Sequence, residues 1–408
     1  MVTPLHVAIV GFGTAGQAAA VLLSRDGHKV EVFEQSSELG PVGAGVLLQP
    51  VGLQVLWEMG LLSEAQSHGS RIDRLYGECA SGGVVMDMHY ARLDRRMSGL
   101  GMQRGALFSI LSDALSNEVS VHCGRRIVSV DDEGRRIRDQ QGNAHGPFDL
   151  VLAADGSASG LRGGVGAARM DRPYPWGALW CLVARNDWPY PHELRQRYVK
   201  ARKMIGLLPV GTQPEDATPR LSFFWSLPTA EFDAWENSGI EPWLDEIQGL
   251  WPEARLQMAA VGECKILRRA SYRDAIPARW YRNRLALLGD SAHAMSPQLG
   301  QGVNMALLDA LALRDALRAH TSVESALSDY AHARRIHVSA YQFWSRWLTP
   351  IFQSERDLLA ALRDLAFHPL GRLWGIRALM LRVLSGTQKG MFGKMDVSED
   401  FLAELAKS

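Results

Sequence analysis

The chain opens with two short apolar runs separated by a glycine-rich turn and an alanine-rich stretch. The first run, His6 to Val10, is mostly apolar, as is typical of a buried parallel strand. Residues 15–24 are rich in Ala and Leu and predict a helix, and Gly27 suits the left-handed turn that ends it. Val30 to Phe33 is a second strand. The pattern therefore predicts a strand–helix–strand unit at the start of the chain.

Further apolar runs of the same strand-and-helix pattern follow as far as residue 170 and appear again near residue 285. Helices are predicted at residues 50–62 and 105–115, and strands near residues 120–130. The segments Asp149 to Ala154 and Leu285 to Leu288 are strongly apolar, which favours buried parallel strands. These strands extend the predicted parallel sheet.

Two regions follow other patterns. Residues 72–90 predict a strand pair that turns at Gly82–Gly83. Residues 171–281 are rich in Trp, Pro and aromatic strand segments, which indicates a separate sheet-based subdomain. From Val303 to Tyr341, and on to Gly390, the pattern is helical.

Composition narrows the class of protein. The 408 residues are 47% hydrophobic and 22% charged, so the chain can bury a large core. Lys and Arg number 44, equal to Asp and Glu, so no strong field attracts nucleic acid. No stretch is a convincing membrane span. The four cysteines lie far apart without a C-x-x-C pair, so we predict free thiols in the cytoplasm and no metal site.

A dinucleotide fingerprint lies in the first turn. The sequence Gly11-x-Gly13-x-x-Gly16 follows a strand and opens a helix, and Glu34 comes 18 residues later at the end of the next strand. Gly11 permits a tight turn, and Gly13 lets the backbone approach a pyrophosphate at the positive end of the helix. Glu34 is placed to accept hydrogen bonds from a ribose. The motif predicts nucleotide binding, but does not distinguish FAD from NAD.

Two later motifs also follow buried strands. Residues 155–162 fit D-G-x-x-S-x-x-R, and residues 289–313 begin Gly-Asp and contain Pro297 and a glycine-rich turn before a helix. Asp290 is placed to bind a polyol such as ribityl. The turn at residues 300–304 directs backbone N–H groups and a helix dipole toward whatever lies before it, which would stabilise the negative charge of a reduced flavin.

With these three motifs in this order, the sequence resembles the single-component FAD-dependent aromatic hydroxylases, or class A flavoprotein monooxygenases, over residues 5–345. The resemblance implies an α/β fold: a Rossmann-like FAD-binding domain of the GR2 type, an inserted sheet-based substrate subdomain and a C-terminal helical segment. We expect the FAD-binding domain at residues 1–72, 98–170 and 282–340, the substrate-binding subdomain at 73–97 and 171–281, and the helical region at 341–408.

The resemblance also implies which residues contact FAD. Arg104 matches an arginine that contacts FAD, residues 43–46 match a segment close to the flavin, and Ile127 is placed near the adenine. The predicted FAD-binding residues are Gly11, Gly13, Ala15, Gly16, Glu34, Gln35, Gly45, Val46, Arg104, Ile127, Asp155, Asp290, Pro297, Gly300, Gly302, Val303 and Asn304.

Some positions depart from the family pattern. Gln35 stands where an Arg often follows the acidic residue, which puts the adenine side in doubt. His293, within the third motif, is interpreted as structural, with a general base as the alternative.

The implied reaction is a monooxygenation. NAD(P)H, which binds transiently because the chain shows only one dinucleotide fingerprint, reduces FAD; O2 then gives a flavin C4a-hydroperoxide that hydroxylates an electron-rich aromatic or other hydrophobic ring. Pro297, Gly300 and Gly302 would border the peroxide, with no obligatory side-chain catalyst. The alternatives left open are a flavin-dependent halogenase or reductase of the same fold, and a flavin-binding partner module without turnover.

The substrate is expected between the flavin and the subdomain sheet. The candidate lining residues are Leu48, Gln49, Tyr90, Trp180, Phe224 and Trp225, with His89 and Tyr272 as further polar candidates. No Arg is assigned to a substrate carboxylate.

The C-terminal segment combines basic and apolar residues. Arg372, Arg377 and Arg382 interrupt an apolar helix. Packing on the FAD-binding domain or a homodimer contact is one interpretation, and a peripheral membrane contact is the other.

Overall fold

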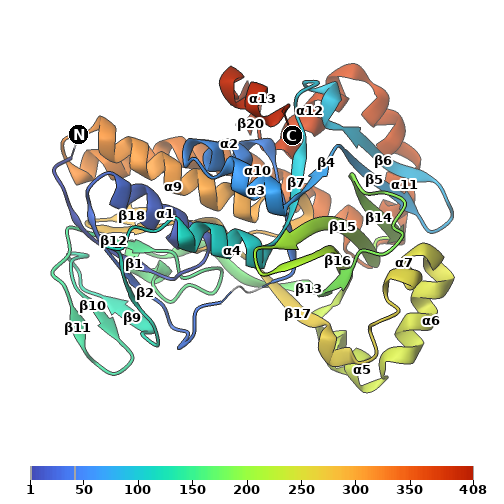
Figure 1. The fold of residues 1–408 in the computed structure, drawn as a ribbon, viewed down its shortest axis with the longest axis horizontal. Coiled ribbons are helices and arrows are strands. Elements are labelled where there is room, and N and C mark those ends of the chain that lie inside the picture. Colours follow the sequence, from blue (N-terminus) through green and yellow to red (C-terminus); the bar gives the residue numbers. More distant parts are fainter. Residues whose placement is uncertain (1, 41–42, 408) are drawn as a thin grey trace.

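The computed structural model describes residues 2–40 and 43–407. A six-stranded sheet in the order β18-β19-β12-β1-β2-β8 forms the first layer, and all neighbouring pairs except β18–β19 are parallel. Helices α1 and α9 lie together beside this sheet (Figure 1). The elements are β1 (His6–Val10), α1 (Thr14–Arg25), β2 (Lys29–Phe33), β8 (Ser120–His122), β12 (Leu150–Ala153), β18 (Tyr281–Arg282), β19 (Leu285–Leu287) and α9 (Gly302–Ala319).

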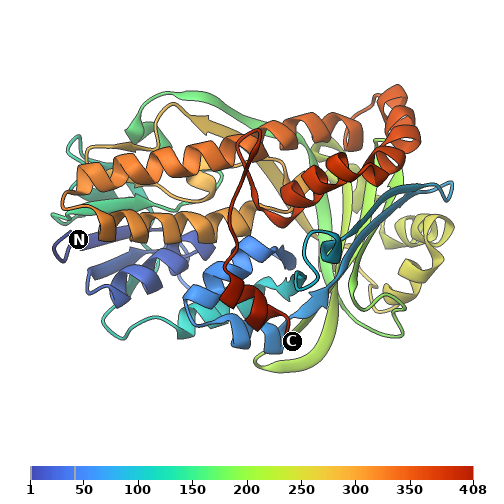
Figure 2. The ribbon, with the colours of Figure 1, turned by 90° about the horizontal axis from the view of Figure 1, so that it is seen from above.

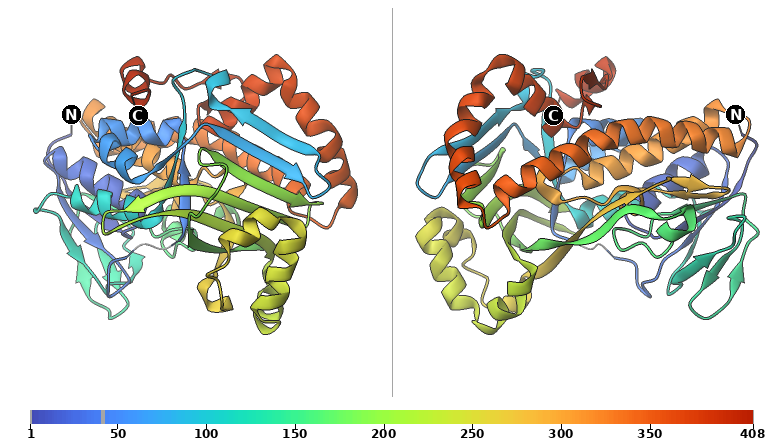
Figure 3. Two further views of the ribbon diagram at one scale, coloured as in Figure 1. Left: turned by 45° about the vertical axis from the view of Figure 1, so that its right-hand side comes forward. Right: turned by 180° about the vertical axis from the view of Figure 1, so that it is seen from behind.

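A second, seven-stranded sheet has the order β17-β13-β16-β15-β14-β5-β6. Its strands are β5 (Arg74–Cys79), β6 (Val84–His89), β13 (Ala168–Ala184), β14 (Glu193–Val199), β15 (Lys203–Gln213), β16 (Asp216–Pro228) and β17 (Arg268–Pro277). Helices α5 (Phe232–Asn237), α6 (Ile240–Leu250) and α7 (Pro252–Gln257) lie below it, and the C-terminal helices lie above it (Figure 3).

A small sheet in the order β3-β7-β4 joins the two layers. At Gly101 in β7, a side chain would collide with the Pro209 carbonyl of β15, so only glycine allows this approach. The connecting elements are β3 (Gly45–Leu48), α2 (Pro50–Glu58), α3 (Leu62–His68), β4 (Ser70–Ile72), β7 (Gly99–Gln103) and α4 (Arg104–Asp113). A third small sheet contains β9 (Ile127–Val130), β10 (Ile137–Asp139) and β11 (Ala144–His145).

Four helices follow α9. They are α10 (Val323–Phe352), α11 (Asp357–Arg372), α12 (Trp374–Ser385) and α13 (Glu399–Leu405), with a short hairpin of β20 (Gln388–Lys389) and β21 (Gly393–Lys394) between the last two. Figure 2 shows α10 running alongside α9 and continuing past the end of the first layer to the second sheet. One helix of 30 residues therefore spans both layers.

The predicted α/β class and most predicted elements are confirmed. The boundaries need correction in two places: residue 341 falls inside α10, and residue 171 falls inside β13. Both elements pass from one layer to the other without a break, and a hydrophobic pattern does not show where packing partners change. The three-part division into domains stays a prediction. Within the described residues, no helix is long and apolar enough to cross a membrane.

Candidate functional site

The turn between β1 and α1 is shaped to receive an anion. Gly11 has φ +104°, and a side chain there would lie 2.4 Å from the Ala154 carbonyl oxygen. Gly13 begins α1 without a side-chain cap or an acidic residue in the first turn. Among the described residues, no atom lies within 4 Å of where a Gly13 side chain would start. The free N–H groups and the positive end of α1 therefore face open space.

Glu34 is fixed beside this turn. Its carboxylate accepts hydrogen bonds from the Phe12 N–H at 2.8 Å and the Ser36 N–H at 2.9 Å. Gln35 next to it is exposed, and Ile127 is buried in the core beyond β8. The acidic group is thus held at the mouth of the turn, as the fingerprint predicts.

A second uncapped helix end meets the first. Helix α9 begins at Gly302, after Gly300 in the left-handed conformation, with no side-chain cap and no acid in its first turn. Asp290 Oδ1 lies 3.8 Å from where a Gly302 side chain would start. Ala15 of α1 packs against Gly289. The first and third motifs, almost 280 residues apart in sequence, therefore lie together.

Asn304 ties this turn to the β3–α2 connection. Its amide accepts a hydrogen bond from the Gln49 N–H at 2.8 Å and donates to the carbonyls of Leu47 and Gly300, both at 3.2 Å. Val303 beside it is half-buried. Asn304 shapes the turn from a fully buried position.

The second motif is joined to the third through Arg162. This arginine is the last residue of the D-G-x-x-S-x-x-R motif, but the sequence analysis did not include it among the predicted site residues. The Arg162 guanidinium is 3% exposed and donates to the carbonyls of Ser291 and Asp290 at 2.8 and 3.2 Å. Asp155 accepts from the N–H groups of Gly160 and Leu161 through one oxygen, whereas its other oxygen is buried without a partner among the described residues. Such an orphaned acceptor fits a hydroxyl or N–H of a bound group.

Arg104, the first residue of α4, lies against the segment at Gly43. Its backbone N–H donates to the Ala44 carbonyl at 2.9 Å, and its side chain packs so closely on Gly43 that any side chain there would collide. Burial lowers the pKa of Arg104, and the nearby Asp290 and Tyr272 oppose this shift. Burial raises the pKa of Tyr272 to about 12. Asp290 and Tyr272 thus lie close enough to Arg104 to influence its charge.

His293 is structural, as expected. Its Nε2 lies 2.7 Å from Asp309 Oδ2, which also accepts from the Gly289 N–H, and Arg334 donates to Asp309 Oδ1 at 2.7 Å. All these side chains are buried. Burial raises the pKa of Asp309, but the neighbouring His293 and Arg334 outweigh burial and lower it to about 2. The cluster anchors the strand end that precedes Asp290.

The substrate candidates divide into three groups. Trp180 and Phe224 are directly paired across β13 and β16 and are half-buried. Phe224 belongs to a cluster with Phe352 of α10 and Phe367 of α11, so its contact with a substrate stays a prediction. Leu48, Gln49 and Tyr90 are buried in the core, and the Tyr90 hydroxyl donates to Gln49 at 2.6 Å, so their substrate contact stays a prediction.

Two candidates lie elsewhere. The prediction for Trp225 is wrong: it packs against Trp243 of α6 on the opposite face of the sheet, because alternate residues of a strand point to opposite faces. His89 is on β6, at the far edge of the same sheet, beside Asp87.

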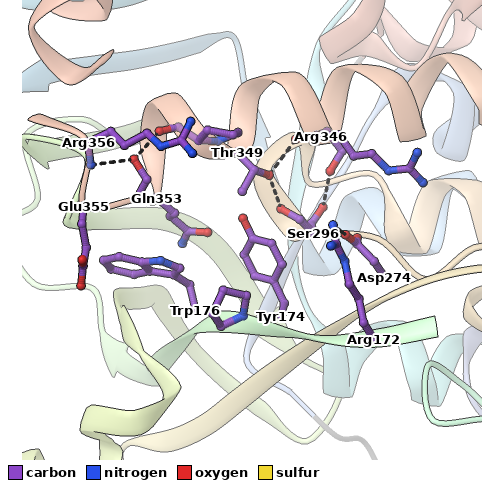
Figure 4. Close-up of a pocket in the computed structure, with 14 residues that line it drawn as sticks. Arg172, Tyr174, Trp176, Asp274, Ser296, Arg346, Thr349, Gln353, Glu355 and Arg356 are labelled. Carbon is purple, nitrogen blue, oxygen red and sulfur yellow. Dashed lines mark hydrogen bonds and ion pairs between the residues drawn. The ribbon is translucent and has the colours of Figure 1, made fainter. Parts of the chain in front are cut away.

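A cavity of about 550 Å3 is lined by Ser296, the residue before Pro297 (Figure 4). Tyr174 and Trp176 of β13 form one wall, and Thr349 and Gln353 from the end of α10 form the other, with Ser296 between them. The sequence analysis missed it because it placed a domain boundary at residue 341, which lies inside α10.

Comparison with known proteins agrees with this geometry. The model of the family described as "FAD binding domain" matches residues 4–344. The FAD-dependent urate hydroxylase of Klebsiella pneumoniae is 27% identical over 334 residues, which cover 80% of this chain and 85% of that protein. The 6-hydroxynicotinate 3-monooxygenase of Pseudomonas fluorescens is 27% identical over 340 residues, covering 77% and 82%.

A solved structure shares the fold. Klebsiella pneumoniae HpxO, complexed with FAD and uric acid, aligns with a TM-score of 0.78 at 23% identity, covering 93% of this chain and 97% of that chain. The matched family model spans most of the chain, including all three motifs. The chain therefore belongs to the FAD-binding domain family and is a FAD-dependent monooxygenase of the class A flavoprotein type.

Proposed function

We propose that this chain uses NAD(P)H and O2 to hydroxylate an electron-rich aromatic or other hydrophobic ring. The observation that carries the proposal is the meeting of two uncapped helix ends, at Gly13 and Gly302, beside Asp290 and Arg104. The relatives named for urate and 6-hydroxynicotinate support an aromatic heterocycle as the substrate class.

The described residues fit FAD. The α1 end would hold the pyrophosphate, Glu34 the ribose and Asp290 the ribityl chain, while the orphaned Asp155 oxygen would accept a hydrogen bond from the cofactor. The α9 end would face the flavin ring and favour its reduced, anionic form. When bound, FAD supplies the oxidation chemistry with O2 and the nicotinamide reductant.

The protein's own residues position the ring and exclude water. Gly300 and Gly302 offer backbone rather than side chains near the reacting region, and Pro297 adds only its compact ring, which leaves room for a planar substrate. Trp180 and Phe224 provide an aromatic surface on the same side of the second sheet. A ring held there would be oriented in a site shielded from water.

The test is turnover by the purified holoprotein. We expect a flavin absorbance spectrum with one FAD per chain, and NAD(P)H oxidation that one of a panel of hydroxylated heteroaromatics accelerates. The product should carry one oxygen atom from labelled O2. NAD(P)H oxidation without an oxygenated product for every compound would contradict the proposal and favour a reductase, and chlorinated product in chloride buffer would favour a halogenase.

The C-terminal helices expose apolar side chains that suit a contact with a partner. Leu358, Leu362 and Leu365 of α11 are 73%, 52% and 75% exposed, and Trp374 at the start of α12 is 80% exposed. We propose a homodimer contact here, with a peripheral membrane contact as the alternative. Light scattering that reports a dimer which Leu362→Asp dissociates would support the first, whereas a monomer that sediments with anionic vesicles would support the second.

The cytoplasmic location rests on the cysteines. All four, Cys79, Cys123, Cys181 and Cys264, are unpaired, as expected of a reducing compartment. We keep this location as a proposal that fractionation of the source cells would test.

A further inference from the structure

The cavity beside Ser296 has the parts of a built binding site. Its volume of about 550 Å3 is in the range of small-molecule pockets. Tyr174 and Trp176 line it with flat aromatic surface, and Trp176 is otherwise buried. Figure 4 shows both rings beneath the last turns of α10, from which Thr349 and Gln353 point down. The space therefore suits a planar ring.

One buried acceptor in this cavity has no partner. Gln353 is 4% exposed, and its side-chain oxygen makes no hydrogen bond with any described residue. A buried polar atom without a partner is costly, so such an atom in a cavity wall indicates a missing donor. A ring N–H or O–H of a ligand would supply that donor.

The rim of the cavity is basic. Arg346 and Arg356 are exposed at the opening, and among the residues that the structure describes neither has a carboxylate within ion-pair distance. Arg172 lies 3.9 Å from the buried Asp274, which partly neutralises that arginine. Glu355 also lines the opening, so three arginines face two carboxylates around the cavity. The excess of arginines favours an anionic group on the ligand.

The cavity is walled off from Pro297 by its own hydrogen bonds. The Ser345 hydroxyl donates to the Ser296 carbonyl at 3.1 Å, the Ser296 and Thr349 hydroxyls lie 2.9 Å apart, and Tyr174 also hydrogen-bonds Ser296. Ser296 is itself buried and lines the cavity, whereas the next residue, Pro297, is exposed and is not among the lining residues. A ligand in the cavity would thus contact Ser296 without occupying the flavin side.

We propose that this cavity is a second binding site, separate from the flavin side of Pro297, for a planar aromatic anion that carries an N–H or O–H donor. The ring lies against Tyr174 and Trp176, the donor binds Gln353, and the anionic group binds Arg346 at the rim. This site goes beyond the proposed hydroxylation, because its occupancy needs neither flavin reduction nor O2.

The test uses calorimetric titration of the oxidised holoenzyme with three matched probes. Indole-3-carboxylate has both groups, indole-3-carboxamide lacks the charge, and 1-methylindole-3-carboxylate lacks the donor. We expect indole-3-carboxylate to bind about tenfold more tightly than either of the other two probes. Each of those probes lacks one hydrogen bond to the protein, and the loss of one such bond weakens binding by about this factor. The visible flavin spectrum should stay unchanged at saturation.

Matched variants assign the contacts. Arg346→Gln should remove the preference for the carboxylate, and Gln353→Met should remove the preference for the free N–H. Arg335→Gln, an exposed arginine on the same helix outside the cavity, should change neither. Arg346 and Arg335 are both exposed, so neither substitution should impair folding, and flavin content checks this.

Three results would overturn the proposal. They are equal affinity for all three probes, an Arg346→Gln variant that binds like the wild type, and a flavin spectral shift that titrates with the calorimetric signal. The last result would place the ligand on the flavin side. Failure of the hydroxylation assay leaves the calorimetric prediction intact, so the two proposals are tested separately.

Discussion

At the scale of single residues, burial decides what a polar side chain does. Asp290 and Gly302 remain exposed at the candidate flavin site, whereas His293, from the same motif, is fully buried against Asp309. The buried cluster continues to Arg334 and His337, whose Nδ1 lies 2.6 Å from the Arg334 guanidinium. Residues of one sequence motif thus serve binding or structure according to their depth in the fold.

The first prediction concerns His337 and pH. Its Nε2 donates to the Gly386 carbonyl, and burial, aided by Arg334, lowers its pKa from 6.5 to about 3. Between pH 3 and pH 6.5, His337 is therefore protonated in the unfolded chain and neutral in the folded chain. The free energy of unfolding should be highest above pH 6.5 and should fall by about 1.4 kcal/mol per pH unit as the pH decreases toward 3.

Chemical denaturation of the protein from pH 4 to 8 measures this slope. His337→Gln should flatten the slope by the contribution of one proton, because Gln keeps a donor and an acceptor without titrating in this range. His332→Gln, on the exposed side of the same helix, is the control and should keep the slope. An unchanged slope in His337→Gln would contradict the assignment.

At the scale of elements, packing between helices and the two faces of a strand carry the site. Helix α9 places its first turn at the flavin site and Asp309 at the contact with α10. Strand β16 presents Phe224 to a cluster that includes Phe352 of α10, and Trp225 to α6. Each element therefore has different packing partners on its two sides.

The second prediction uses neighbouring arginines of α10. Arg334→Ala should lower the free energy of unfolding by about 3–5 kcal/mol, because it leaves Asp309 charged and less compensated in the core. Arg335→Ala, which is exposed, should change it by less than about 0.5 kcal/mol. Urea unfolding of both variants makes the comparison, and equal stabilities would show that the buried ion pair does not hold α9 to α10.

The third prediction compares adjacent residues of β16. Phe224→Ala should raise the KM for the ring substrate and increase NAD(P)H oxidation without product, because the aromatic surface at the site is lost. Trp225→Ala should instead lower the free energy of unfolding by about 3–5 kcal/mol through the cavity it leaves. Steady-state kinetics and unfolding of both variants measure these effects. A KM change in Trp225→Ala alone would reverse the assignment of the two faces.

At the scale of the whole molecule, the proposed flavin site is built from distant segments. The turn after β1, residues 155–162 and residues 289–304 meet only in the folded chain, so ligand binding and folding are coupled.

The fourth prediction follows from this coupling. Adding FAD to the flavin-free protein at 100 times its Kd should raise the free energy of unfolding by about 2.7 kcal/mol. Asp290→Ala should weaken FAD binding and reduce this gain at the same FAD concentration. Thermal unfolding with and without FAD measures both, with Asp329→Ala on the exposed side of α10 as the control. No stabilisation of the wild-type protein by FAD would contradict the proposed cofactor site.

The sequence by itself determined the local parts of this protein. Glycine spacing, buried strands and helix starts depend on neighbours within a few residues, so Gly11, Gly13, Glu34 and Asp290 could be recognised as candidates from the pattern.

Only the tertiary structure decided how those parts meet. It placed Trp225 behind the sheet, because one residue of register selects the face. It joined the second and third motifs through Arg162, and it brought the end of α10 over β13 to form the cavity beside Ser296. The last two of these contacts join residues more than a hundred positions apart. Such pairings depend on how whole elements pack, which the local pattern does not encode.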